Sequence, residues 1–188
     1  MSTPRERYLR ALRGLDDVIA AVHDDQWDSR STCPPWTVRQ LTGHVVDAQR
    51  QVTSMLSGDG GIQPESSPEV LARLAGEDPA ATWRRAHQQT VTALARVDDD
   101  AVLLTPLGDA PVSQLLATAV IEPLLHAWDL ATSVGGTADL EPETVEATLA
   151  GVEALGDRLA ATGMYAPARP TVDGMTAAER LLALTGRG

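Results

Sequence analysis

Residues 112–133 read VSQLLATAVIEPLLHAWDLATS, and this stretch decides both the fold and the candidate site. Its apolar residues recur at intervals of three and four positions, which is typical of an amphipathic helix in a protein interior. The stripe that should face the interior consists of Leu115, Ala119, Glu122, His126 and Asp129. The stretch therefore predicts a buried helix with polar groups on its inner side.

The same spacing recurs in four further long stretches. Long helices are expected over residues 4–24, 37–55, 78–97, 112–133 and 141–161, and shorter ones over 69–75 and 176–184. No segment shows the strict alternation that predicts a strand. The sequence thus predicts an all-α four-helix bundle with short extra helices and a docked C-terminal tail, as a single domain over residues 1–188.

Composition excludes several function classes. The chain has 188 residues, with 15 Lys and Arg against 26 Asp and Glu, and its net charge of -11 repels nucleic-acid phosphates and anionic lipids. The longest apolar stretch, residues 115–121, is interrupted by Thr118 and falls short of the ~20 residues that span a membrane. Residues 1–13 carry charges throughout and lack a secretory apolar block. We therefore expect a cytoplasmic protein that binds neither nucleic acid nor membrane.

Three polar residues stand where a bundle helix should be apolar. His44 lies one turn from Leu41 and Ala48 on the inner stripe of the second helix, while Glu122 and His126 are four residues apart on the fourth. Side chains at that separation project from one face about 6 Å apart, so both can reach one ion. Two imidazoles and one carboxylate suit Zn²⁺, Ni²⁺, Mn²⁺ or Fe²⁺ and leave positions open for a substrate.

A simpler interpretation of these residues stays open. An inner histidine is often a hydrogen-bonded core residue, and Glu122 with His126 is also an ordinary ion pair of a helix. Asp129, one turn beyond His126, is either the acceptor of an imidazole N–H behind the metal or a solvated charge.

Three other side chains also have two interpretations. His87 is a wall of the same pocket or a core residue, and Trp128 is a pocket wall or bundle packing. Cys33, the single cysteine, cannot form an internal disulfide. It precedes the second helix, whose dipole favours a thiolate nucleophile, but a small buried residue is the alternative.

Four segments together resemble a known family. They are CPPWTVRQL at 33–41, His44, EPLLHAWDLA at 122–131 and RLLALTGR at 180–187. The combination resembles the DinB/YfiT-like metal-binding four-helix proteins, in the branch that is similar to mycothiol-dependent maleylpyruvate isomerase. The resemblance covers essentially the whole chain.

The resemblance implies a divalent ion, usually zinc, held by His44, Glu122 and His126. It also implies that the small thiol mycothiol binds with its sulfur at the metal, where a thiol loses its proton at neutral pH. Such a thiolate can add reversibly to an activated double bond, which is isomerisation, or it can stay on an electrophile, which is S-transfer. No protein side chain is assigned as the catalytic nucleophile.

The chain departs from the family in three places. Pro35 stands where the family usually has glycine, and Pro123 directly follows Glu122, which disfavours helical geometry at that ligand. The resemblance implies an isomerase with a second, C-terminal domain, and 188 residues leave no room for that domain. Maleylpyruvate is therefore not the expected substrate.

We expect a metal-dependent enzyme of the transferase or isomerase type, acting with a mycothiol-like thiol on a small electrophile. Two alternatives remain open. A hydrolase or oxygenase could use the same ligands with activated water or Fe²⁺ and O₂. A non-catalytic ligand-binding bundle would follow if Pro123 turns Glu122 away. The expected partners are a small substrate and a small thiol, and a homodimer is left open.

Overall fold

A computed structural model describes residues 1–106, 108–161 and 163–188. It confirms a predominantly helical fold. The helices, in chain order, are α1 (Pro4–Ala20), the 3-10 turn η1 (Asp24–Gln26), α2 (Val38–Leu56), α3 (Pro68–Ala75), α4 (Pro79–Leu94), α5 (Val112–Ala119), α6 (Ile121–Ser133), α7 (Pro142–Leu155), α8 (Asp157–Ala161) and α9 (Ala177–Leu184). Within the described ranges, no helix combines the length and apolarity that crossing a bilayer requires.

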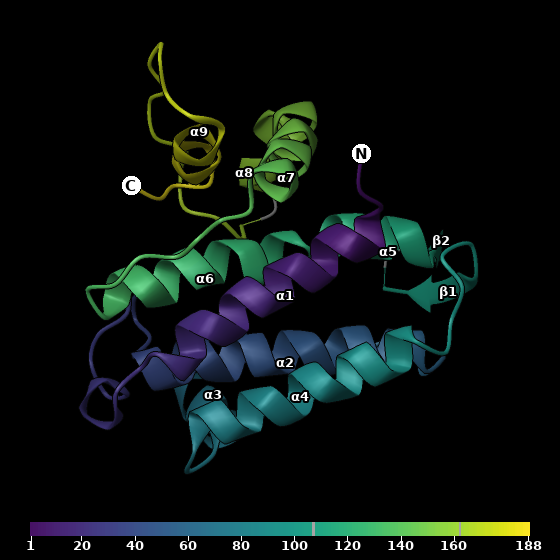
Figure 1. The fold of residues 1–188 in the computed structure, drawn as a ribbon, viewed down its shortest axis with the longest axis horizontal. Coiled ribbons are helices and arrows are strands. Elements are labelled where there is room, and N and C mark those ends of the chain that lie inside the picture. Colours follow the sequence, from purple (N-terminus) through teal and green to yellow (C-terminus); the bar gives the residue numbers. More distant parts are fainter. Residues whose placement is uncertain (107, 162) are drawn as a thin grey trace.

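The bundle consists of α1, α2, α4 and the α5–α6 pair (Figure 1). Helix α1 packs against α4, α5 and α6, while α2 packs against α3, α4 and α6. Helix α7 contacts α9 and α1, so that α7, α8 and α9 lie outside the bundle on the side of α1 and α6. The largest fully buried side chains include Tyr8, Leu12, Leu15, Leu41, Trp83, Leu116 and Leu130. The helices therefore share one core, but the stripe predicted for residues 112–133 is shifted: Leu116 is fully buried, whereas Leu115 and Ala119 are only partly buried.

The second helix begins where its sequence predicts. The Thr37 side chain accepts from the Gln40 backbone N–H at 3.3 Å, and the Gln40 side chain accepts from the Thr37 N–H at 2.9 Å. This reciprocal cap satisfies two N–H groups that a helix start leaves free and stabilises the helix by about 1 kcal/mol. It fixes the start of α2, the helix that carries His44.

The helix expected over residues 112–133 is interrupted. Helix α5 ends at Ala119 and α6 begins at Ile121. Pro123 has no N–H to donate to the carbonyl of Ala119, and its ring crowds that same carbonyl, which ends the first helix there. Glu122 nevertheless lies in the first turn of α6, so the proline does not remove it from the helix.

Other expected boundaries were also wrong. Residues 141–161 form two helices because Gly156 adopts a φ of 51°, which ends α7. Helices α1 and α4 end a few residues earlier than expected. An antiparallel hairpin of β1 (Val102–Thr105) and β2 (Gly108–Pro111) was missed. Each strand has four residues, and Leu103 is the buried residue of β1, which is too short a pattern to show alternation.

Helix α3 comes closest to α2 at Gly43, the residue before His44. A Cβ atom at Gly43 would lie 1.9 Å from the carbonyl oxygen of Leu71. That separation is far below van der Waals contact, and the obstacle is backbone, which cannot rotate away. Glycine at this position therefore allows the close packing that places α2.

We predict that Gly43→Ala destabilises the protein by about 2 kcal/mol or more, since overpacking against rigid backbone costs at least that much. Thermal and urea unfolding followed by circular dichroism measures the change. Gly151→Ala is the matched control, because Gly151 lies in α7 with nothing within 4 Å of its added Cβ. It should raise stability by about 0.5–1 kcal/mol. Equal stability of Gly43→Ala and the parent would contradict the close approach of α3.

Candidate metal centre

The structure brings His44, Glu122 and His126 together at the contact of α2 with α6. Glu122 Oε2 lies 3.2 Å from His44 Nε2 and 3.3 Å from His126 Nε2. One nitrogen or oxygen of each residue lies within 4.8 Å of the others. The side chains are 22%, 34% and 10% exposed, respectively, so the cluster is open to solvent on the side of His44 and Glu122. A small molecule can therefore reach it.

Asp129 lies behind His126 rather than in solvent. Its Oδ2 is 2.9 Å from His126 Nδ1, and its side chain is 1% exposed. An imidazole whose Nδ1 is held by a carboxylate presents its Nε2 in a fixed direction and is a better metal ligand. Here that Nε2 faces Glu122.

The C-terminal tail supplies the partner of Asp129. The Arg187 Nε lies 2.9 and 3.1 Å from the two carboxylate oxygens, and its Nη2 lies 2.8 Å from Oδ2. Thr32 donates its hydroxyl to the same residue, at 3.2 Å to the backbone oxygen and 3.3 Å to Oδ1. The two-pronged guanidinium contact matches the geometry of a carboxylate. The tail thus fixes the carboxylate that fixes His126.

The charges in this cluster favour one further cation. Burial alone would raise the pKa of Glu122, but His126 and His44 hold it well below its usual value. The pKa of Asp129 is lowered in the same way by His126 and Arg187. Burial would lower the pKa of His126, but Asp129, Cys33 and Glu122 raise it well above normal. Two carboxylates and one guanidinium sum to one net negative charge, which favours a proton on an imidazole or a metal ion at the cluster.

Aromatic and sulfur groups lie beside the ligands. The Trp36 ring lies 5.0 Å from that of His44, and the imidazoles of His44 and His126 meet edge to face at 4.9 Å. Cys33 is half-buried, and its sulfur lies within 4.8 Å of ligand atoms of His126 and Asp129. The Trp36 ring therefore lies against a candidate ligand, and Trp36 and Trp128 are both partly buried against the hydrophobic core.

His87 does not join the cluster. Its ring stacks on Trp83 with centroids 5.7 Å apart, and its Nδ1 lies 3.7 Å from an oxygen of Asp16 on α1. Trp83 donates to the same carboxylate at 2.8 Å. His87 belongs to the packing of α4 on α1 and is not a wall of the candidate site.

Sequence reasoning missed the roles of Trp36, Tyr165 and Arg187 around the cluster. Arg187 and Trp36 lie in the family-like segments, which was the available signal, whereas Tyr165 lies in an extended segment without a pattern. Burial and the Glu122 carboxylate raise the pKa of Tyr165 to about 12, and Arg187 opposes them. The phenol is therefore a neutral neighbour of the cluster.

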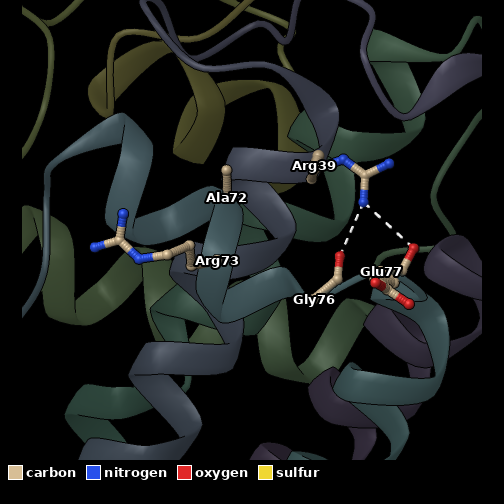
Figure 2. Close-up of a pocket in the computed structure, with 5 residues that line it drawn as sticks. All are labelled: Arg39, Ala72, Arg73, Gly76 and Glu77. Carbon is tan, nitrogen blue, oxygen red and sulfur yellow. Dashed lines mark hydrogen bonds between the residues drawn. The ribbon is translucent and has the colours of Figure 1, made fainter.

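The surface depression drawn in Figure 2 is separate from the cluster. It has a volume of about 620 Å³ and is lined by Arg39, Ala72, Arg73, Gly76 and Glu77. Arg39 donates to the backbone oxygens of Gly76 at 2.9 Å and Glu77 at 3.5 Å, and its guanidinium points away from that of Arg73. Polar groups do not converge there on a ligand.

Two histidines and a glutamate from facing helices of the bundle meet around one point. This arrangement places the protein in the class of helical-bundle proteins with a candidate metal centre. Residues 8–131 match the sequence family described as the mycothiol maleylpyruvate isomerase N-terminal domain. The chain belongs to this family, which confirms the resemblance found in the sequence.

Two further comparisons identify relatives of this chain and solved structures with the same fold. Uncharacterized proteins of two Mycobacterium tuberculosis strains are 30% identical over 186 residues, covering 98% of this chain and 97% of theirs. Crystal structures of the mycothiol-dependent maleylpyruvate isomerase and of its histidine-to-alanine mutant share the fold, with TM-scores of 0.57 and 0.55 and identities of 19% and 21%. Each comparison covers 80% of this chain and 71% of the isomerase chain.

We predict that Arg187→Ala destabilises the protein by about 3 kcal/mol, because it leaves the buried Asp129 carboxylate without its guanidinium. Urea unfolding measures the loss, and hydrogen exchange should show weaker protection of α9. Arg180→Ala is the control, since its pair with Glu153 is half exposed, with side chains 53% and 40% accessible, and should contribute less than about 1 kcal/mol. Equal losses in the two variants would contradict the tethering role of Arg187.

Proposed function

We propose that this protein is a metal-dependent enzyme that uses a small thiol of the mycothiol type. The enzyme either isomerises a small electrophile with the help of the thiol or joins the thiol to the electrophile through its sulfur, which is S-transfer. The observation that carries the proposal is the meeting of His44, Glu122 and His126 at a solvent-accessible point of the bundle. Membership of the mycothiol isomerase family supports the choice of thiol.

The donor set fits a divalent ion. Asp129 engages Nδ1 of His126, so Nε2 remains for the centre, and Nε2 of His44 points to the same carboxylate oxygen of Glu122. Two neutral imidazoles and one carboxylate are common zinc ligands, and three protein ligands leave a position for a substrate or cofactor. Nickel, manganese or iron can occupy such a set as well.

Each residue of the candidate site would have its own role in this reaction. His44, Glu122 and His126 hold the ion, which when bound would lower the pKa of a thiol that supplies the sulfur nucleophile. Asp129 and Arg187 keep the His126 ring in place, and the Trp36 ring lies against the His44 ring. Isomerisation returns the thiol unchanged, whereas S-transfer joins its sulfur to a substrate carbon and passes the thiol proton to the product or the leaving group.

We expect protein purified without a histidine tag to bind one zinc ion per chain, measured by mass spectrometry of the metal and by calorimetry. His126→Ala and Glu122→Gln should each weaken the binding by more than about 100-fold, since each removes one of three ligands. His87→Ala is the control and should bind zinc as the parent does, because His87 lies against Trp83 and Asp16. Unchanged zinc affinity of His126→Ala would contradict the site.

Thiol dependence separates the proposal from its alternatives. The zinc-loaded protein should accelerate the reaction of chlorodinitrobenzene or a maleate ester with mycothiol, and mycothiol should raise its melting temperature. Glu122→Gln should lose both effects, while His87→Ala should keep them. Turnover that is the same without any thiol would instead indicate a hydrolase or an oxygenase, and mycothiol binding without turnover would indicate a binding protein.

A further inference from the structure

A cavity of about 540 Å³ lies between α7, α8 and α9, outside the bundle. Its volume lies in the range of sites for small organic ligands, which is roughly 300–1,000 Å³. Side chains that line it include Val152, Leu159, Tyr165, Ala166, Arg180 and Leu184. Most of them are apolar, so the cavity is suited to a hydrocarbon group.

The C-terminal tail connects the cavity to the candidate metal centre. Tyr165 lines the cavity, and the Glu122 carboxylate raises the pKa of its phenol while Arg187 opposes that shift. Leu184 also lines the cavity, and the chain continues from there to Arg187, which holds Asp129. A Cβ atom at Gly186 would lie 2.6 Å from the Cβ of Ala166, so the tail passes directly against the cavity wall.

Two arginines of this region are already paired. Arg180 at the cavity lies 2.8 Å from Glu153, and Arg187 lies 2.8 Å from Asp129. The whole chain carries a net charge of -11. A dicarboxylate entering here would lose water without gaining an unpaired counter-ion from these arginines, which is unfavourable. An uncharged apolar group would gain from burial instead.

We propose that this cavity holds the uncharged apolar part of the electrophilic substrate, so that the enzyme acts on neutral electrophiles with an aliphatic or aromatic group in preference to dicarboxylates. The inference rests on the proposed function for its chemistry. The cavity and its neighbours carry the substrate class: a mostly apolar lining, arginines that are already paired, and a tail that runs from the cavity to Arg187.

Maleate and its esters test the substrate class, because they share one double bond and differ in charge and chain length. With zinc-loaded protein and saturating mycothiol, kcat/KM relative to the uncatalysed rate should be at least tenfold higher for dimethyl maleate than for the maleate dianion. It should rise about tenfold again from dimethyl to dipropyl maleate, as the longer chains are buried. A preference for the dianion would overturn the proposal. The proposal would also be overturned if the cavity variant Ala168→Trp raised the KM for mycothiol instead of the KM for the ester.

Ala168→Trp is that variant, since Ala168 lines the cavity yet is exposed, so the larger side chain fills the space without entering the core. It should remove the gain from dimethyl to dipropyl maleate and leave zinc binding unchanged. Val172→Trp is the matched control, because Val172 is 66% exposed on the same segment and does not line the cavity. Equal chain-length dependence in both variants would overturn the proposal.

A binding measurement keeps the inference separate from the enzyme activity. Ligand-observed NMR should detect dipropyl succinate, an unreactive saturated analogue, on the parent and on Val172→Trp but not on Ala168→Trp, and should not detect the succinate dianion. This binding pattern without any turnover would support the inference about the cavity and reject the proposed function. Thiol-dependent turnover without binding of the diester would support the proposed function and reject the inference about the cavity.

Discussion

The buried carboxylate of Asp129 is the constraint on which the arrangement of the site depends. A carboxylate that is 1% exposed must be paired, because an isolated charge in the protein interior costs several kcal/mol. Its partners come from three parts of the chain: His126 on its own helix, Thr32 in the loop before α2, and Arg187 in the tail. Satisfying one charge therefore docks the tail, positions the loop and orients an imidazole.

The geometry of the candidate metal centre depends on this pairing. His126 presents Nε2 toward Glu122 because its other nitrogen is occupied, and His44 meets them because α2 is capped at Thr37 and packed tightly on α3 at Gly43. The apolar bundle thus surrounds a polar cluster that carries one net negative charge. That charge, together with the meeting of the three side chains, is the physical basis for proposing a cation at this point.

The match to the family divides the chain into two parts. The segment that matches the family, residues 8–131, contains His44, Glu122, His126 and Asp129. Arg187, Tyr165 and the cavity residues of α7, α8 and α9 lie beyond it. In our proposal the shared bundle supplies the thiol chemistry, whereas the additional helices select the substrate by shape and by the absence of an unpaired cation among the arginines described above.

The sequence by itself determined the helices and the residues of the cluster, because helical periodicity and the four-residue spacing of Glu122 and His126 are local properties. It could not decide whether Pro123 would turn Glu122 away, nor show that His87 packs elsewhere and that Trp36 lies against His44. It also missed the short hairpin and the pairing of Arg187 with Asp129, 58 residues apart. The hairpin was missed because its two four-residue strands are too short to show alternation. Only the tertiary structure decided the other features, because contacts between distant segments depend on how whole helices pack and leave no periodic trace in either segment.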